Sequence, residues 1–432
     1  MRPRTRARLG TLGAALLVCA APALTVPAAA ATGTVRAAGA AADVTVEEQR
    51  LTAGPVPEEI LRRSGFDDVA PEFARALAAV RTEAGARELA GDAGRALWRR
   101  AVHRAQGHGP AGGDLSRDDD RPLYWARLGM TRAVREWRPA FPLDEAGRQD
   151  LVARVERASR GQDSVDLPAG DGVQRIVVTG FDPFQLDADI RRSNPSGAAA
   201  LALDGTTIRT ASGPARIETA VFPVRWADFA QGTVERTLLP HLGPGPRQAD
   251  LFTTVSQGRV GRFDLERFNG AWRGGHPDNV RESSTGTVPV PDGVPTVRPQ
   301  PQWTVTTLPY RRIAEADTGR FPVYDNTAVT EIPAGGTTAV HRPDGPTPGS
   351  AARAGGGGDY LSNEIAYRAT LLRDALDPAV PGGHLHTPVL RFGEGNTDPA
   401  GGSITDEAFV RDRLAITAQV REVVRRAADT LD

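Results

Sequence analysis

Residues 355–363, GGGGDYLSN, decide how the rest of the sequence is interpreted. Four glycines lead into a short apolar pair and one small hydroxyl side chain, and a helical pattern then runs through residues 364–372. Ser362 is therefore expected at or near a helix N-terminus, where free backbone N–H groups and the helix dipole favour negative charge. Two interpretations follow. Either Ser362 or Asn363 caps the helix, as both residue types commonly do, or Ser362 is a nucleophile.

The region around this stretch has the pattern of an α/β domain. Short apolar runs rich in β-branched residues predict buried strands at residues 175–180, 218–224 and 249–255. Helical segments separate these runs, so we expect a three-layer αβα sandwich around a twisted, mostly parallel sheet. Ligands of such sheets bind at the carboxyl ends of the strands. The loops at 180–184, 256–262 and 384–388 are therefore expected to converge.

The domain organisation follows from changes in composition along the chain. Residues 1–31 combine a basic start, an apolar stretch and a small-residue cleavage site, which predicts a signal peptide and a secreted, extracellular protein. Residues 32–56 are rich in Ala, Gly and Pro and predict an extended lead-in. Apolar residues at helical spacing over 57–161 predict an all-helical module of unknown role. The α/β domain is expected over 173–432, with a long, loop-rich insertion at about 280–358.

The composition excludes several classes of function. The 432 residues contain 52 Lys and Arg against 53 Asp and Glu, so no basic surface for nucleic acid is indicated. The only cysteine, Cys19, lies in the expected signal peptide, and the mature chain would have no thiol for a disulfide or a thiolate metal site. No H-x-x-x-H or H-E-x-x-H spacing occurs, and we expect neither a metal nor a cofactor. After signal cleavage we also expect no membrane association, because no other stretch is long and apolar enough to span a bilayer.

The residue types also permit one kind of covalent catalysis. His384 and His386 alternate, so they would lie on the same side of a strand. A serine, a histidine and a carboxylate form a nucleophile, base and orienting group for acyl transfer. Ser362 and one of these histidines could supply the first two. The carboxylates in or beside predicted loops are Asp264, Glu266, Asp278 and Asp359.

Several short motifs, taken together and in order, resemble the pyroglutamyl peptidase I (pyrrolidone carboxyl peptidase) family. They are GFDPF at 180–184 with NPS at 194–196, SQ at 256–257 with ER at 266–267, PDN at 277–279, GDYLSN at 358–363, and GGHLHTP at 382–388. The resemblance spans residues 173 to 432. It implies an α/β sandwich that removes an N-terminal pyroglutamyl residue from peptides, so that the partner is a peptide with a blocked N-terminus.

The resemblance also assigns roles to single residues. It implies a catalytic triad of Ser362, His386 and Glu266, with Ser362 at the position of the family's nucleophilic cysteine. It implies a substrate pocket formed by Phe181, Phe184, Gln257, Tyr360 and Leu361. Ordinary roles remain open for some of these, since the two phenylalanines could be core residues and Gln257 could cap a loop.

Two departures from the family pattern separate two hypotheses. Ser362 replaces a cysteine, and the family's arginine before Pro277 is absent, with Gly275 and His276 in that place and Arg273 nearby. A neighbouring imidazolium can hold a thiol ionised but not an alcohol, so His386 would have to act as a general base during the attack. The first hypothesis is a serine-type hydrolase. The alternative is a catalytically inactive family member that binds peptide N-termini.

Overall fold

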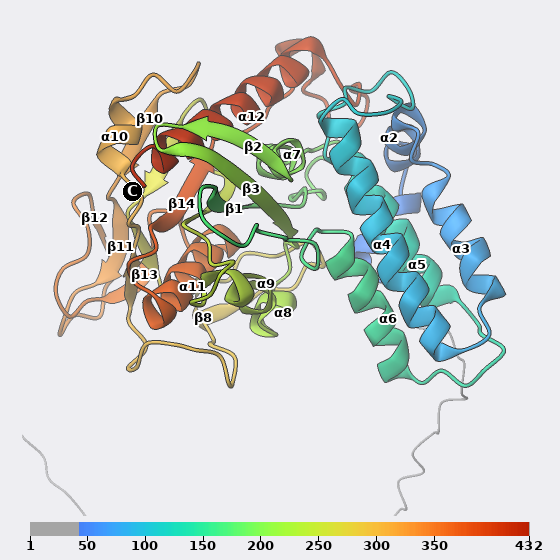
Figure 1. Ribbon diagram of the computed structural model, residues 1–432, viewed down its shortest axis with the longest axis horizontal. Coiled ribbons are helices and arrows are strands. Elements are labelled where there is room, and N and C mark those ends of the chain that lie inside the picture. Colours follow the sequence, from blue (N-terminus) through green and yellow to red (C-terminus); the bar gives the residue numbers. More distant parts are fainter. Residues whose placement is uncertain (1–42, 432) are drawn as a thin grey trace, which may run out of the picture. The chain divides into compact units, whose positions relative to one another are not determined.

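The computed structural model describes residues 43–431, so the predicted signal peptide and residues 32–42 lie outside the described part. A seven-stranded sheet forms its centre, in the order β10-β5-β14-β4-β1-β3-β2 (Figure 1). Its strands are β1 (Gln174–Phe181), β2 (Thr206–Thr210), β3 (Gly213–Phe222), β4 (Leu251–Gln257), β5 (Phe263–Glu266), β10 (Val323–Asn326) and β14 (Gly382–Thr387). Neighbouring strands are parallel except in the pairs β2–β3 and β14–β5. The predicted strands and the mostly parallel sheet are confirmed.

Helices cover both faces of the sheet because its central strands are apolar on both sides. Ile176 and Leu251 belong to a core cluster shared with helices on one face, and Val177 and Phe252 belong to a cluster on the other. The first face carries α7 (Pro195–Leu203), α10 (Tyr310–Glu315) and α12 (Glu407–Ala428). The second carries α8 (Trp226–Ala230), α9 (Thr233–Leu242) and α11 (Leu361–Leu376). This is the expected three-layer αβα sandwich.

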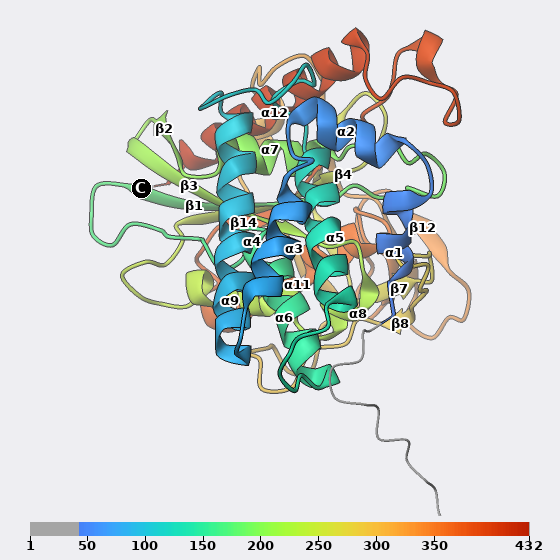
Figure 2. The ribbon, with the colours of Figure 1, turned by 90° about the vertical axis from the view of Figure 1, so that its right-hand side faces the viewer.

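A helical region precedes the sheet, as the sequence predicts. It contains α2 (Val56–Ser64), α3 (Val69–Ala79), α4 (Glu83–Ala105), α5 (Arg121–Glu136) and α6 (Glu145–Ala158). Figure 1 and Figure 2 show α3 to α6 side by side. Small residues allow close packing here: a Cβ atom at Gly94 in α4 would lie 2.7 Å from the Cβ of Ala158 in α6. The helices therefore pack on one another through a core of their own.

The predicted extended lead-in is wrong for residues 46–52. These residues form a short helix, α1 (Val46–Gln49), and a 3₁₀ turn, η1 (Arg50–Thr52). The cause is a capping box: the Glu48 N–H donates to Thr45 Oγ1 at 3.1 Å, and the Thr45 N–H donates to Glu48 Oε2 at 2.9 Å. The T-x-x-E pattern was present in a segment whose overall composition favours extended structure.

The predicted insertion at 280–358 contains more regular structure than its composition suggests. One of its segments, β10, joins the edge of the central sheet by pairing parallel to β5. The remaining short strands lie in it or beside it: β6 (Phe268–Gly270), β7 (Trp272–Gly274), β8 (Thr285–Thr287), β9 (Trp303–Val305), β11 (Val329–Ile332), β12 (Val340–Arg342) and β13 (Ala351–Ala354). One further 3₁₀ turn, η2 (Glu394–Asn396), precedes α12. The domain boundaries expected from the sequence stay predictions.

Among residues 43–431, no helix combines the length and the apolar character that crossing a membrane requires.

Candidate active site

A small cavity lies at the carboxyl ends of β1 and β4, beside the first turn of α11. It is lined by Phe181, Phe184, Asn194, Val224, Ser256, Gln257, Tyr360, Leu361 and Ser362. All five residues expected to form a substrate pocket are in this set, together with the expected nucleophile. The cavity has a volume of about 40 Å³, room for roughly three water-sized probes.

The expected base and acid form a hydrogen-bonded pair next to this cavity. The Nδ1 of His386, on β14, lies 2.7 Å from Oε1 of Glu266, at the end of β5. The second carboxylate oxygen of Glu266 accepts a hydrogen bond of 2.6 Å from Asn326 Nδ2. The Glu266 side chain is fully buried and that of His386 is 7% exposed. A buried carboxylate held at both oxygens fixes the orientation of the imidazole ring.

Ser362 is close to this pair without being bonded to it. Its Oγ donates a 3.1 Å hydrogen bond to the carbonyl oxygen of Gly357. Within the described part of the chain, no hydrogen bond joins Ser362 to His386. A Cβ atom on Gly357 would lie 3.2 Å from Cε1 of His386, so the ring and the serine flank the same glycine. The Nε2 atom of His386 has no hydrogen-bond partner among residues 43–431.

The capping interpretation of Ser362 and Asn363 is wrong. The N-cap of α11 is Tyr360, which makes no side-chain capping bond within the described residues. Asn363 instead ties the helix start to β6: its Oδ1 accepts from the Gly270 N–H at 2.9 Å, and its Nδ2 donates to the Gly270 carbonyl at 2.8 Å. The first-turn N–H groups of α11 thus have no cap from Tyr360, and they lie beside the cavity.

The glycine run before α11 is required by close packing on these side chains. A Cβ atom on Gly355 would lie 2.1 Å from Asn363 Oδ1, and one on Gly356 would lie 2.2 Å from Glu266 Oε2. A side chain at either position would displace groups that the site uses. The glycines therefore bring the backbone directly over the Glu266–His386 pair.

Two residues discussed from the sequence have partners of their own. Gln257 does cap a loop, because its Oε1 accepts the Leu390 N–H at 3.0 Å, yet it also lines the cavity and keeps its amide N–H groups. Arg273, near the position where the family's arginine is absent, is not among the residues that line the cavity. Its guanidinium is held in a bidentate pair by Glu364, with N–O distances of 2.5 and 2.6 Å.

The helical region supports the loop that carries Phe181 and Phe184. Asp182, between them, accepts 2.8 and 2.9 Å hydrogen bonds from Arg160 and a 2.5 Å bond from Arg127 of α5. The three side chains are at most 2% exposed. Burial lowers the pKa of Arg127.

A second support holds Asn194, which lines the cavity. Asp120 accepts hydrogen bonds from the Ser193 hydroxyl and, at 2.9 Å, from the Asn194 N–H. Burial, with the neighbouring Asp119 carboxylate, raises the pKa of Asp120 to about 7 from the ordinary 3.8. The folded protein thus binds this proton more tightly than the unfolded chain. The resulting stabilisation is complete below the ordinary pKa and is lost as the pH rises through about 7.

We expect Asp120→Asn to reduce this pH dependence, because the amide keeps a hydrogen-bond acceptor but cannot ionise. Thermal unfolding followed by circular dichroism at pH 5 and pH 8 measures the effect. The wild-type Tm should fall more over this interval than the Tm of the variant. An equal change in Tm between pH 5 and pH 8 for the two proteins would show that Asp120 has the same pKa in the folded and unfolded chains.

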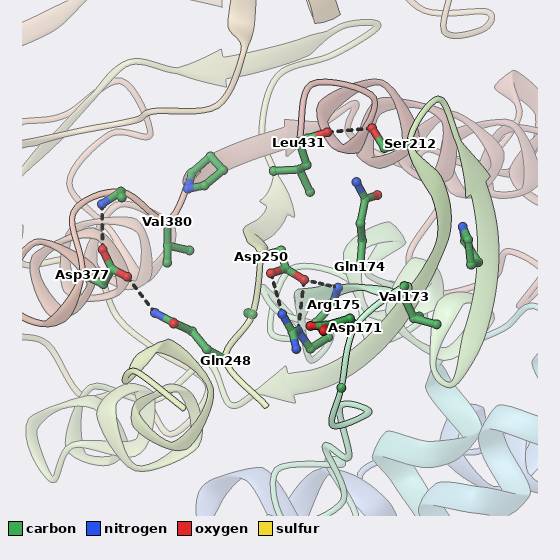
Figure 3. A pocket seen from close by; sticks show the side chains of 16 residues that line it. Asp171, Val173, Gln174, Arg175, Ser212, Gln248, Asp250, Asp377, Val380 and Leu431 are labelled. Atoms are coloured by element: carbon green, nitrogen blue, oxygen red, sulfur yellow. Dashed lines mark hydrogen bonds and ion pairs between the residues drawn. The ribbon is translucent and has the colours of Figure 1, made fainter. Parts of the chain in front are cut away.

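A larger hollow lies at the opposite strand ends and lacks comparable chemistry. It measures about 450 Å³ and is lined by residues at the amino ends of β1 and β14 (Figure 3). Several of its polar side chains are engaged with one another: Arg175 pairs with Asp250 at 2.8 Å, and Gln248 donates to Asp377 at 3.0 Å. In sheets of this type ligands bind at the carboxyl ends. The smaller cavity is therefore the candidate active site.

No three His, Cys, Asp or Glu side chains within residues 43–431 are grouped as a metal site would require. No role follows from the sequence for three residues that complete the site. Ser256 and Asn194 belong to the quoted motifs SQ and NPS, so their position in the sequence was a usable signal. Asn326 lies in the predicted insertion, and no local pattern connects it with Glu266.

Comparison with known proteins gives two kinds of similarity. A family model described as the PA0049 N-terminal domain matches residues 28–156, and one described as the PA0049 C-terminal domain matches residues 175–299 and 321–391. The chain is 36% identical to "Uncharacterized protein PA0049" of Pseudomonas aeruginosa, over 86% of this chain and 84% of that protein.

The similar solved structures are pyroglutamyl peptidases. A mutant pyrrolidone carboxyl peptidase of Pyrococcus furiosus has a TM-score of 0.39 and 22% identity, covering 60% of this chain and all of that one. Pyroglutamyl peptidase I of Bacillus amyloliquefaciens has a TM-score of 0.35 and 21% identity, covering 58% and 98%. The Thermococcus litoralis enzyme has a TM-score of 0.37 and 18% identity, covering 58% and 93%.

Proposed function

The chain belongs to the PA0049 family, and we propose that it is a hydrolase that removes an N-terminal pyroglutamyl or similar residue from peptides. Ser362 is the nucleophile, His386 the general base and Glu266 the group that orients His386. One observation carries this proposal. The five residues expected to bind substrate line a single cavity with Ser362. Beside this cavity, His386 Nδ1 and Glu266 Oε1 form a hydrogen bond of 2.7 Å.

The reaction would follow the usual steps of acyl transfer. Ser362 Oγ attacks the carbonyl carbon of the first residue while its proton passes to His386 Nε2, and Glu266 stabilises the imidazolium. The first-turn N–H groups of α11 are placed to stabilise the negative oxygen of the tetrahedral intermediate. The C–N bond then breaks and the leaving amine takes the proton from His386. Water, activated by the same ring, releases the acyl group from Ser362.

The exchange of cysteine for serine determines what the histidine must do. A serine hydroxyl stays protonated at neutral pH, so the base must remove its proton during the attack. The 2.7 Å bond to Glu266 supports this role, because a buried carboxylate stabilises the charged ring that forms.

We also propose that the protein acts outside the cell on peptides whose N-terminus is blocked, rather than on nucleic acid or at a membrane. Residues 1–31, which lie outside the described residues, would direct export and be removed. N-terminal sequencing of protein recovered from the culture medium tests this. A first residue near position 32 is expected, and retention of Met1 would contradict it.

The activity itself is tested with the purified exported protein. Pyroglutamyl 4-nitroanilide should be hydrolysed, whereas prolyl 4-nitroanilide, which carries an amine in place of the lactam, should not. A fluorophosphonate probe should label Ser362, identified by mass spectrometry of the tryptic peptide. A folded protein that hydrolyses neither anilide and takes up no label would refute the proposal.

The alternative is an inactive protein that binds peptide N-termini, and two contacts favour it. The Ser362 hydroxyl is directed to Gly357 and not to His386, and Arg273 is engaged by Glu364. This function predicts that a pyroglutamyl peptide binds in calorimetry without turnover and that Ser362→Cys restores cleavage. Hydrolysis by the unmodified protein would exclude it.

A further inference from the structure

The cavity contains a second hydroxyl that the proposed reaction does not use. Ser256, at the end of β4, lines the cavity and is only 4% exposed. Its Oγ lies 2.9 Å from Nε2 of His384, on the neighbouring strand. The other ring nitrogen, Nδ1, lies 2.8 Å from Thr254 Oγ1. His384 is thus held between two hydroxyls of one strand, and the position of each proton decides what Ser256 presents to a ligand.

Counting hydrogen bonds assigns these protons. Thr254 Oγ1 donates to the Gly383 carbonyl at 3.2 Å, so its oxygen is left to accept from His384 Nδ1–H. In that tautomer Nε2 is an acceptor, and the Ser256 hydroxyl donates to it. The opposite tautomer would leave the Gly383 contact without a proton. Burial, with the nearby His386, lowers the pKa of His384 well below its ordinary value, so the ring is neutral as this assignment requires.

Ser256 therefore offers its lone pairs to the cavity and not its proton. Successive side chains of a strand point to opposite faces of the sheet, so the side chain of the neighbouring Gln257, whose Oε1 accepts the Leu390 N–H, is directed to the other face. The hydroxyl of Ser256 therefore presents an acceptor to the cavity, and an amide N–H of the ligand is the donor that matches it.

We propose that Ser256 is a specificity-determining residue that accepts a hydrogen bond from the N–H of a lactam or similar cis amide in the first residue of the substrate. His384 positions Ser256 and does not act as a base. This inference rests on the proposed function and names the chemical group that the cavity selects. A ring of the same size without the N–H leaves the Ser256 lone pairs without a donor and is rejected.

Two substrates that differ in one atom test this inference. They are pyroglutamyl 4-nitroanilide and the corresponding lactone, 5-oxotetrahydrofuran-2-carbonyl 4-nitroanilide, in which an oxygen replaces the ring N–H. The wild-type protein should prefer the lactam in kcat/KM by roughly 10- to 100-fold. Ser256→Ala should reduce this preference to about threefold or less, mainly through a lower kcat/KM for the lactam. Ser212→Ala, a serine change at the opposite strand ends, is the control and should keep the full preference.

The outcomes separate this inference from the proposed function. Hydrolysis of both anilides with equal kcat/KM, or an unchanged preference in Ser256→Ala, overturns the role of Ser256 and leaves the hydrolase intact. The wild type could instead hydrolyse neither anilide, while calorimetry shows that it binds the lactam more tightly than the lactone and that Ser256→Ala loses this preference. That result would contradict the hydrolase function and support the role of Ser256. If the protein neither binds nor hydrolyses either compound, both the role of Ser256 and the proposed hydrolase function are wrong.

Discussion

Glu266→Gln is expected to lower kcat for pyroglutamyl anilides by roughly 10⁴-fold while leaving the fold intact. Glutamine has the shape of glutamate, but its amide donates where the carboxylate accepts. His386 would then hold its proton on Nε2, the nitrogen that must receive the proton of Ser362. The positive charge that forms on the ring would also lose its buried counter-charge. Steady-state kinetics at saturating substrate measure the loss.

Comparison with Ser362→Ala and a buried control makes this result specific. If the triad acts as one unit, Ser362→Ala should lose at least as much activity, and the double variant should lose little more. Glu331→Gln is the control, because Glu331 is also fully buried and hydrogen-bonded but lies on β11, where it contacts Arg342 and Thr347. It should keep wild-type activity. A Glu266→Gln protein within tenfold of the wild type would remove Glu266 from the mechanism.

The sequence predicted the site where short-range patterns place residues at the ends of elements. Gln257 ends a strand and Ser362 lies in the first turn of a helix, and the carboxyl ends of parallel strands meet at one edge of the sheet. Alternation indicated only that His384 and His386 lie on the same side of a strand. The expectation of a mostly parallel sheet was therefore enough to predict that the loops at 180–184, 256–262 and 384–388 converge. The role of each residue came from the family resemblance and not from the spacing.

The sequence could not predict the contacts that fix the geometry. Asn326 reaches Glu266 only because β10 pairs with β5 across more than fifty residues, and backbone pairing of that kind leaves no local pattern. The orientation of the Ser362 hydroxyl depends on the Gly357 carbonyl, which no residue type specifies. The purpose of the helical region was equally hidden. Its arginines look like surface charges in sequence, yet Arg127 and Arg160 are buried against Asp182.

Asp182→Ala is expected to destabilise the folded protein by about 3–5 kcal/mol, the range for breaking a buried ion pair. The change leaves the buried guanidinium of Arg127 without its carboxylate partner, while Arg160 keeps only its ion pair with Glu156. It also releases the loop between Phe181 and Phe184, so KM should rise in any protein that remains folded. Chemical denaturation gives the free energy of unfolding, and hydrogen exchange over residues 180–187 reports the loop directly.

A partly exposed pair provides the control. Asp250→Ala removes the partner of the Arg175 guanidinium and the acceptor of the Arg175 N–H, but these side chains are 33% and 18% exposed, so the expected loss is about 1–2 kcal/mol, smaller than for Asp182→Ala. Adding Arg127→Met to Asp182→Ala should recover part of the stability, because it removes the buried charge that Asp182→Ala leaves unpaired. Recovery of stability without recovery of KM would show that Asp182 positions the loop as well as neutralising charge. If Asp182→Ala and Asp250→Ala lowered the free energy of unfolding equally, the helical region would not stabilise the loop that carries Phe181 and Phe184 in the way proposed.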